Sequence, residues 1–318
     1  MKVLLVTTWD IPCGIAEHAF YLKEAVEAAD PTIQIDPAPL GIAPGPDWEA
    51  IANRIRRTDL VHLNYQAALL SQWTPERLAW IHALGKKVVV TWHDSGVPNS
   101  DQCQALNSVA DAMILHEPFD DLPVEKTFYW RMGVPDWPGA YQFADGGRPL
   151  LGSIGFPSGH KNYTELARLT GALGWGLLLI APGATPDQQW EWRDLNPHLR
   201  IETAFLDRRR ALSLLAGCDA TCFAYVTNNA GQSGPILQGI ATRKPVIALS
   251  TCRMFRALLQ DDLASHVIYW PQTFEQIADC LKHLPIQRVD PGIVALAEQE
   301  SWLKVGQKYA RLYQDLIG

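Results

Sequence analysis

Short apolar runs alternate with amphipathic stretches along the whole chain. In the first half, the apolar runs predict strands at residues 2–8, 59–65, 87–93 and 110–116, with a weaker one at 32–36. The segments between them, such as AEHAFYLKEAVEAA and PERLAWIHALG, have the three-to-four-residue apolar spacing of helices. Nearly continuous apolar strands separated by helices indicate a parallel sheet that is covered on both faces.

The alternation restarts after an irregular segment. Residues 131–149, RMGVPDWPGAYQFADGGRP, are rich in Gly and Pro and break the periodicity, as a linker does. Further strands are predicted at 150–156, 176–182, 199–203, 219–225 and 245–250, with a sixth candidate at 266–270. We therefore expect two doubly wound α/β domains, residues 1–145 and 146–318. Ligands bind such sheets at the carboxyl ends of the strands, and two facing domains would enclose a cleft.

The last stretch, QESWLKVGQKYARLYQDLIG, predicts an amphipathic helix. Its apolar positions fit two placements equally well. The helix could close the second domain, or it could return to pack on the first.

Composition narrows the class of protein. The 318 residues are 47% hydrophobic and 19% charged, as in an ordinary soluble globular protein of two domains. A net charge of −7 gives no electrostatic reason to expect nucleic acid. The start, MKVLLVTTW, is too short for a signal-peptide core, and no run approaches the length of a membrane span. A cytoplasmic location is the expectation, and the oligomeric state is not indicated.

The six cysteines show no CxxC pair and no other metal-ligand spacing. Cys218 and Cys222 flank a strand-like run and are expected to be buried thiols. We therefore expect no metal site and no cofactor.

The first predicted strand is followed by a loop that could bind a ligand. Gly14 at the mouth of the next helix would let backbone N–H groups approach a phosphate or sugar, although a glycine at such a turn can also be purely structural. The loop lacks the GxGxxG fingerprint of dinucleotide-binding proteins. Glu17 and His18 lie one turn inside the helix, where they could face a ligand or the core.

Polar residues follow the strand KVVVTW. His93 and Asp94 stand at its carboxyl end, where a histidine is well placed to hydrogen-bond a sugar. His62, inside an earlier strand, is expected to be a core histidine with its hydrogen bonds satisfied.

Two loops of the second half have the composition of phosphate sites. In LLGSIGFPSGHKNYTELARL, Gly155 and Gly159 keep the loop compact, and the Lys161 ammonium could offset a diphosphate. In NNAGQSGPILQGIATRKPVIALS, Ser233 and Gly234 precede a helix that contains Gln238.

These motifs, in this order, resemble the GT-B glycosyltransferases of family 4 over nearly the whole chain. PCGIAEHAFYL is similar to that family's glycine-rich first loop, and VVVTWHD to its strand followed by His-Asp. GSIGFPSGHKN resembles its phosphate loop, ILQGIATRKPVIA its E-A-M-A-x-G-x-P-V-I-A segment, and SW…YxxLY its terminal helix.

The resemblance implies two Rossmann-like domains and transfer of a sugar from a nucleoside-diphosphate donor with retention of configuration. The donor would bind the C-terminal domain without an essential metal. The acceptor, a glycan, a lipid-linked molecule or a small molecule, would bind the N-terminal domain, and a lipid-linked acceptor would bring peripheral membrane contact.

The resemblance also assigns roles by position. His93 and Lys161 would be catalytic, with His93 at the donor sugar and Lys161 at the diphosphate. Other donor-binding positions are Gly14, Gly155, Phe205, Ser233, Gly234 and Gln238, with Phe205 near the base. Glu17 and Asp94 are acceptor-side candidates.

The sequence departs from the family pattern where paired glutamates are expected. These positions hold Ala230 and Gln238, so one carboxylate contact to the donor is lost and the other becomes an amide. The arginine often found near the phosphate loop falls on Phe156 or Pro157. We predict a working site with an unusual donor preference. The alternative is a non-catalytic GT-B relative that acts as a binding or scaffold subunit.

Overall fold

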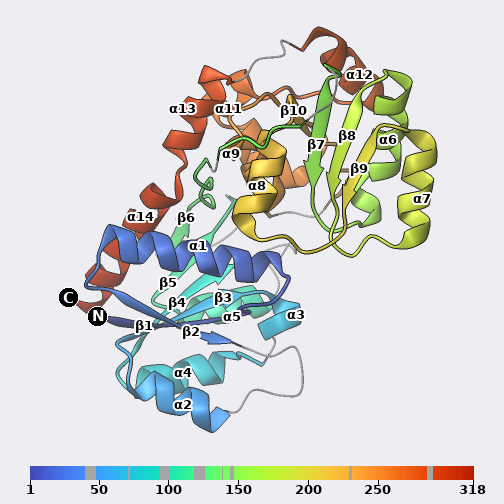
Figure 1. The fold of residues 1–318 in the computed structure, drawn as a ribbon. Coiled ribbons are helices and arrows are strands. Elements are labelled where there is room, and N and C mark those ends of the chain that lie inside the picture. Colours follow the sequence, from blue (N-terminus) through green and yellow to red (C-terminus); the bar gives the residue numbers. More distant parts are fainter. Residues whose placement is uncertain are drawn as a thin grey trace. The chain divides into compact units, whose positions relative to one another are not determined.

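The computed structural model describes residues 1–39, 48–70, 72–93, 101–117, 126–137, 139–143, 147–228, 231–284 and 289–318. Two predicted positions, Asp94 and Ala230, lie outside the described residues. The chain divides into two compact units (Figure 1). Unit 1 comprises Met1–Gly133, Asn229–Gln232 and Glu300–Gly318, and unit 2 comprises Val134–Asn228 and Ser233–Gln299.

Unit 1 is built on a parallel sheet with the strand order β2-β1-β3-β4-β5-β6. The strands are β1 (Lys2–Thr7), β2 (Gln34–Pro39), β3 (Leu60–Tyr65), β4 (Lys87–Trp92), β5 (Ala112–Leu115) and β6 (Thr127–Tyr129). The helices are α1 (Gly14–Ala29), α2 (Trp48–Arg56), α3 (Ala67–Leu70), α4 (Pro75–Ala83), α5 (Asp101–Val109) and α14 (Trp302–Ile317).

The two faces of this sheet differ in polarity because alternate residues of each strand point to opposite faces. Val61, Leu63 and Tyr65 of β3 belong to the apolar core that α2, α4 and α5 cover. His62 and Asn64, between them, are also fully buried. Their face is covered by α1 and α14, so these polar side chains must find their partners inside the protein.

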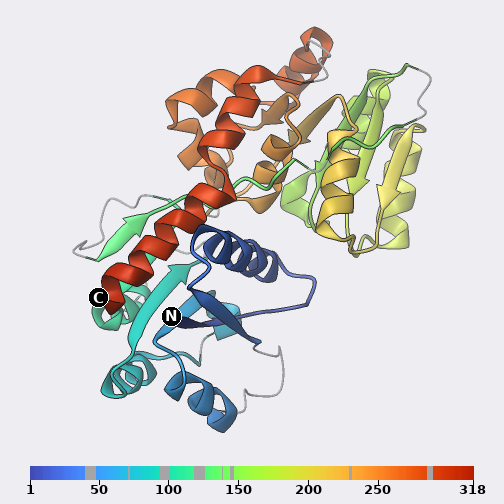
Figure 2. The ribbon, with the colours of Figure 1, turned by 60° about the vertical axis from the view of Figure 1, so that its left-hand side comes forward.

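The terminal helix α14 packs on α1 (Figures 1 and 2). Gly306 makes this approach close, since a Cβ there would lie 2.3 Å from the carbonyl oxygen of Ala25. α14 also supplies hydroxyl groups to the buried polar residues. The Tyr313 hydroxyl lies 2.6 Å from His62 Nδ1, and Thr91 Oγ1 lies 2.8 Å from His62 Nε2. The prediction that His62 is a satisfied core histidine is confirmed.

Unit 2 has a five-stranded parallel sheet with the order β11-β10-β7-β8-β9. Its strands are β7 (Leu150–Ile154), β8 (Gly176–Ile180), β9 (Leu199–Glu202), β10 (Ala220–Phe223) and β11 (Val246–Ala248). Its α-helices are α6 (Tyr163–Ala172), α7 (Pro186–Leu195), α8 (Arg208–Ala216), α9 (Gly234–Ala241), α10 (Arg256–Leu259), α11 (Asp262–Val267), α12 (Phe274–His283) and α13 (Pro291–Gln299). Short 3₁₀ helices span Gly159–Lys161 and Arg253–Phe255.

Most predicted strands are present, with two differences. The sixth strand expected at 266–270 is wrong, because α11 continues to Val267 and Tyr269 makes only an isolated bridge to Ile247. The short strand β6 lies just before the irregular segment and was not predicted. Within that segment the chain passes from unit 1 to unit 2 between Gly133 and Val134, before the expected boundary at 145/146.

The environment of two cysteines agrees with the prediction. Cys218 and Cys222 are buried thiols, and burial raises the pKa of both.

Among the described residues, no helix combines the length and the apolar character needed to cross a bilayer.

Candidate functional site

In unit 2, the point where the strand order reverses lies between β7 and β10. The chain runs from β7 outward to β9 and then returns to place β10 on the other side of β7. Ligands bind at the carboxyl ends of strands at such a point. The loops that leave β7 and β10 contain the predicted residues Gly155 and Lys161 and lead to Ser233.

Gly155 has a structural reason to be glycine. Its φ of +142° is one that side-chain-bearing residues rarely adopt, and a Cβ would lie 3.3 Å from Lys161 Nζ and from the Tyr163 hydroxyl. The Tyr163 hydroxyl donates to the Gly155 carbonyl over 3.0 Å. Gly155 therefore lets the loop fold tightly around the lysine.

Lys161 ends the 3₁₀ helix and is buried, with 7% of its surface exposed. Its ammonium lies 3.5 Å from the centroid of the Tyr225 ring, a cation–π contact. Two bonds join the loops on either side. Asn162 Nδ2 donates to the Ala224 carbonyl over 2.7 Å, and the Val226 amide donates to the His160 carbonyl over 2.8 Å.

Burial lowers the pKa of Lys161 to about 7, because an ammonium loses hydration inside the protein. The charge of this side chain therefore depends on its surroundings near neutral pH. An anionic group beside it would favour the charged form, so the site is suited to a ligand such as a phosphate.

Helix α9 begins beyond this loop pair. Ser233 precedes Gly234, the first helical residue, and its hydroxyl forms no capping bond within the helix. Gln238 is one turn further on and is buried. A Cβ at Gly234 would meet no described residue within 4 Å, so a ligand could approach the backbone there.

Two exposed aromatic rings stand at the same edge of the unit 2 sheet. Phe156 follows β7 and Phe205 follows β9, and they are 45% and 48% exposed. Their ring centroids are 6.3 Å apart and their planes differ by 20°, so the rings are stacked. Large apolar side chains that are exposed side by side point to a binding surface. A flat aromatic ligand such as a base could cover this pair of rings.

In unit 1, Gly14 is the first residue of α1. Among the described residues, a Cβ at Gly14 would meet nothing within 4 Å, so none of them requires a glycine there. Glu17 follows within the first turn and is half-buried.

His93 follows β4, and its Nε2 lies 2.5 Å from Oδ1 of Asn64. The Asn64 amide nitrogen lies 3.2 Å from both Thr7 Oγ1 and the Ile15 carbonyl oxygen. Because that carbonyl can only accept, the Asn64 amide must direct its NH₂ group toward it and its Oδ1 toward His93. Since Oδ1 can only accept, His93 Nε2 must carry the proton. Its Nδ1 therefore has a free lone pair.

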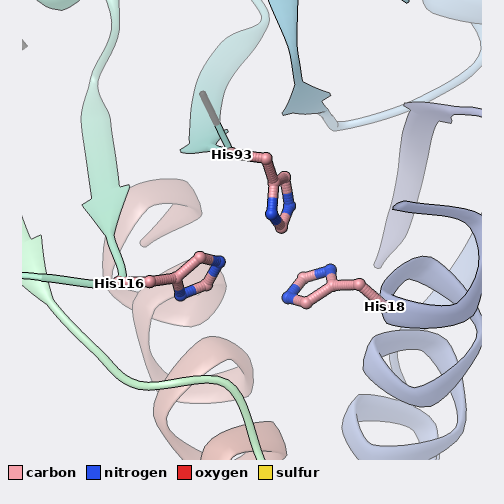
Figure 3. A group of neighbouring side chains, drawn as sticks. All are labelled: His18, His93 and His116. Atoms are coloured by element: carbon pink, nitrogen blue, oxygen red, sulfur yellow. The ribbon is translucent and has the colours of Figure 1, made fainter. Parts of the chain in front are cut away.

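His93 is one of three clustered histidines. His18 from α1 and His116, which follows β5, turn their rings toward it (Figure 3). The three potential ligand atoms all lie within 4.8 Å of one another. The sequence raised His18 only as a residue that could face a ligand, and it gave no signal for His116. No local motif could have linked them, since the three positions are far apart in the chain.

The predicted residues thus fall into two groups. Gly14, Glu17, His18 and His93 belong to unit 1, and the remaining described candidates belong to unit 2.

Comparisons with known proteins show structural similarity only. The sequence matches no family model and no curated protein. The fold resembles Anabaena Alr3699/HepE, solved in complex with UDP and glucose, at 14% identity and a TM-score of 0.71, covering 99% of this chain and 100% of that one.

Two further solved structures have the same architecture. AviGT4, a glycosyltransferase involved in avilamycin A biosynthesis, is 16% identical with a TM-score of 0.61, covering 100% of this chain and 98% of its own. An α,α-trehalose-phosphate synthase (UDP-forming) from Burkholderia xenovorans is 11% identical with a TM-score of 0.66, and both chains are covered completely. Together with the two parallel sheets, these similarities show a two-domain Rossmann-like GT-B fold.

Proposed function

We propose that this chain is a retaining glycosyltransferase that moves a sugar from a nucleoside-diphosphate donor to a hydroxyl group of an acceptor, in the synthesis of a glycan or glycoconjugate. The observation that carries the proposal is Lys161. A lysine that is buried beside a glycine loop at the switch point of a GT-B unit, with its pKa lowered to about 7, is suited to a diphosphate.

In the proposed reaction, the acceptor oxygen forms a bond to the anomeric carbon as the bond from that carbon to the diphosphate oxygen breaks. The acceptor proton passes to the departing diphosphate. Negative charge develops on that diphosphate, and protonated Lys161 would stabilise it in place of a bridging metal ion. Retention of configuration rests on the family resemblance.

We propose the remaining donor contacts from the family resemblance together with the positions of the residues in unit 2. The backbone at Ser233 and Gly234 would contact the phosphates, with Gln238 as a hydrogen-bond partner for the ribose. The exposed rings of Phe156 and Phe205 would cover one face of the base. Since a similar structure holds UDP, we propose a uridine nucleotide as the first donor to test.

The acceptor is assigned to unit 1, with His93 at the donor sugar and Gly14 and Glu17 near the reacting groups. Asp94 keeps its proposed acceptor-side role, although it lies outside the described residues.

Calorimetric titration tests donor binding. UDP, GDP, ADP and CMP are titrated into the chain with a chelator present, and one nucleoside diphosphate is expected to bind. Lys161→Met keeps most of the side-chain volume without the charge. It should weaken that affinity about tenfold to a hundredfold, because a bond to a charged group contributes roughly 1.5–3 kcal/mol. Lys304→Met, an exposed lysine on α14, is the control and should bind normally.

A specific observation supports the second candidate, a non-catalytic binding or scaffold subunit. Gln238 stands where the family has a glutamate. Binding of a nucleotide without turnover of any nucleotide sugar would support that candidate, and release of nucleoside diphosphate by the purified chain would exclude it.

A further inference from the structure

We propose that His18, His93 and His116 form a three-histidine binding site for a divalent transition metal ion of the Zn²⁺ class. The site lies wholly within unit 1 and goes beyond the proposed transferase activity.

The first argument is convergence. The ring centroids of His18 and His93 are 4.5 Å apart, those of His93 and His116 are 4.9 Å apart, and those of His18 and His116 are 5.4 Å apart. Their potential ligand atoms lie within 4.8 Å of one another (Figure 3). Tetrahedral zinc bonds of 2.0–2.1 Å imply nitrogen separations of about 3.3 Å, so the ligand atoms need to approach by at most roughly 1.5 Å.

The second argument is the direction of the hydrogen bonds. His116 Nδ1 lies 2.9 Å from the Trp130 carbonyl oxygen. A carbonyl only accepts, so His116 Nδ1 is protonated and Nε2 carries the lone pair. Asn64 fixes His93 in the same way, which leaves Nδ1 free. An outer bond that holds each imidazole in one tautomer is typical of histidines that bind metals.

The third argument is that nitrogen atoms of the cluster lack partners. Among the residues that the structure describes, His116 Nε2 is buried without a hydrogen bond. The ring of His18 is close enough to the Asn64 side chain to interact with it, but neither of its nitrogens makes a hydrogen bond of normal geometry. Unpaired buried polar atoms are costly, and a shared cation would bind one nitrogen lone pair from each of the three rings.

A cavity beside the cluster can hold a fourth ligand. It measures about 20 Å³, enough for one water molecule, and His93, His116, Glu117 and Gln232 are among its lining residues. The Gln232 side-chain oxygen accepts from the Met132 amide over 2.6 Å, whereas its buried amide nitrogen has no partner among the described residues. A metal-bound water in this cavity could accept a hydrogen bond from that nitrogen.

The choice of ion follows from the ligands. Three imidazole nitrogens suit Zn²⁺, Cu²⁺ or Ni²⁺, whereas Mg²⁺ and Ca²⁺ prefer oxygen atoms. This site therefore does not replace Lys161, which would act on the diphosphate in unit 2. His93 belongs both to this metal site and to the proposed sugar site. A bound ion would therefore occupy the Nδ1 lone pair that could otherwise accept a hydrogen bond from the donor sugar.

The experiment is a Co²⁺ titration of the metal-stripped full chain, followed by visible absorption, with Zn²⁺ then added to displace the Co²⁺. We expect one equivalent to bind with the intense visible bands of a tetrahedral nitrogen site. His18→Gln and His116→Gln should each weaken binding at least tenfold, while His266→Gln, which removes an exposed histidine of unit 2, should not.

Circular dichroism of the metal-free variants establishes that they are folded. Zn²⁺ should also raise the unfolding temperature of the wild type, since a ligand bound only by the folded state stabilises it. Absence of tetrahedral Co²⁺ bands in the wild type would overturn the site, and so would wild-type affinity in either cluster variant. The assay uses neither nucleotide nor turnover, so Lys161→Met should bind the metal normally even if the proposed transferase activity proves wrong.

Discussion

Lys161 is a buried side chain whose charge would change when the proposed diphosphate binds. In the free protein its pKa is about 7, because burial opposes the charge. A bound diphosphate would favour the charged form and raise this pKa. Ligand binding and proton uptake are therefore linked.

We predict that nucleoside diphosphate affinity falls as pH rises from 7 to 9. The free lysine loses its proton in this range, so binding must first restore it, and the affinity should fall by up to about tenfold per pH unit. The phosphates are already ionised here, since their last pKa is near ~6. Calorimetry in buffers of different ionisation enthalpy would measure the proton uptake, and Lys161→Met should lose it. A pH-independent affinity would contradict the role of Lys161.

A variant of Gln238 tests whether its amide takes the place of the glutamate found in the glycosyltransferase family that the sequence resembles. We predict that Gln238→Ala lowers nucleotide affinity by up to about tenfold, because a neutral hydrogen bond contributes roughly 0.5–1.5 kcal/mol. The same titration with Gln276→Ala, on the surface of α12, provides the comparison. Equal affinities in the two variants would remove Gln238 from the site.

At the residue scale, the sequence indicated candidate residues but not the surroundings that each of them has in the fold. Lys161 was a candidate because glycines flank it, but its burial against Tyr225 depends on β10, far along the chain. His116 gave no signal at all, because its relation to His18 and His93 exists only after the sheet has formed. The stacking of Phe156 on Phe205 was equally hidden.

At the scale of elements, the interface between α14 and the unit 1 sheet combines close packing with buried hydrogen bonds. Tyr309 and Tyr313 bring hydroxyl groups to Thr91 and His62. Periodicity marks these tyrosines as one face of a helix. The sequence could not decide where this helix packs, because the matching polar positions lie inside strands that read as apolar runs.

Removal of one such hydroxyl should be costly. We predict that Tyr313→Phe lowers the free energy of unfolding by about 1–3 kcal/mol, because it leaves His62 Nδ1 buried without its partner. Tyr141→Phe removes an exposed hydroxyl and should change stability little. Urea unfolding of both variants checks this, and equal midpoints would argue against the buried bond.

The close approach of α14 to α1 can be tested in the same way. Gly306→Ala places a methyl group 2.3 Å from the Ala25 carbonyl oxygen, so the helices must separate. We expect a loss of about 1–3 kcal/mol, typical of overpacking, despite the better helix propensity of Ala. Lys304→Ala on the exposed side of α14 should be nearly neutral. An unchanged or higher unfolding midpoint in Gly306→Ala would show that α14 is not held this closely.

At the scale of the whole molecule, the repeated alternation of strands and helices was enough to predict two doubly wound units, and the structure has the GT-B fold. The sequence was less informative about where the units begin and end. Unit 1 includes the last helix, α14. No local sequence pattern could reveal this membership, because it follows from packing between distant segments.

The most direct test of the proposed function is release of nucleoside diphosphate from nucleotide sugars by the purified, metal-stripped chain. UDP-sugars are assayed first, followed by GDP- and ADP-sugars, each with simple glycan acceptors. We expect one donor to turn over, and Lys161→Met to reduce the rate at least a hundredfold while Lys304→Met does not. If the folded chain binds a nucleotide but turns over no donor, or if Lys161→Met keeps the wild-type rate, the account of this chain as a transferase acting through Lys161 is wrong.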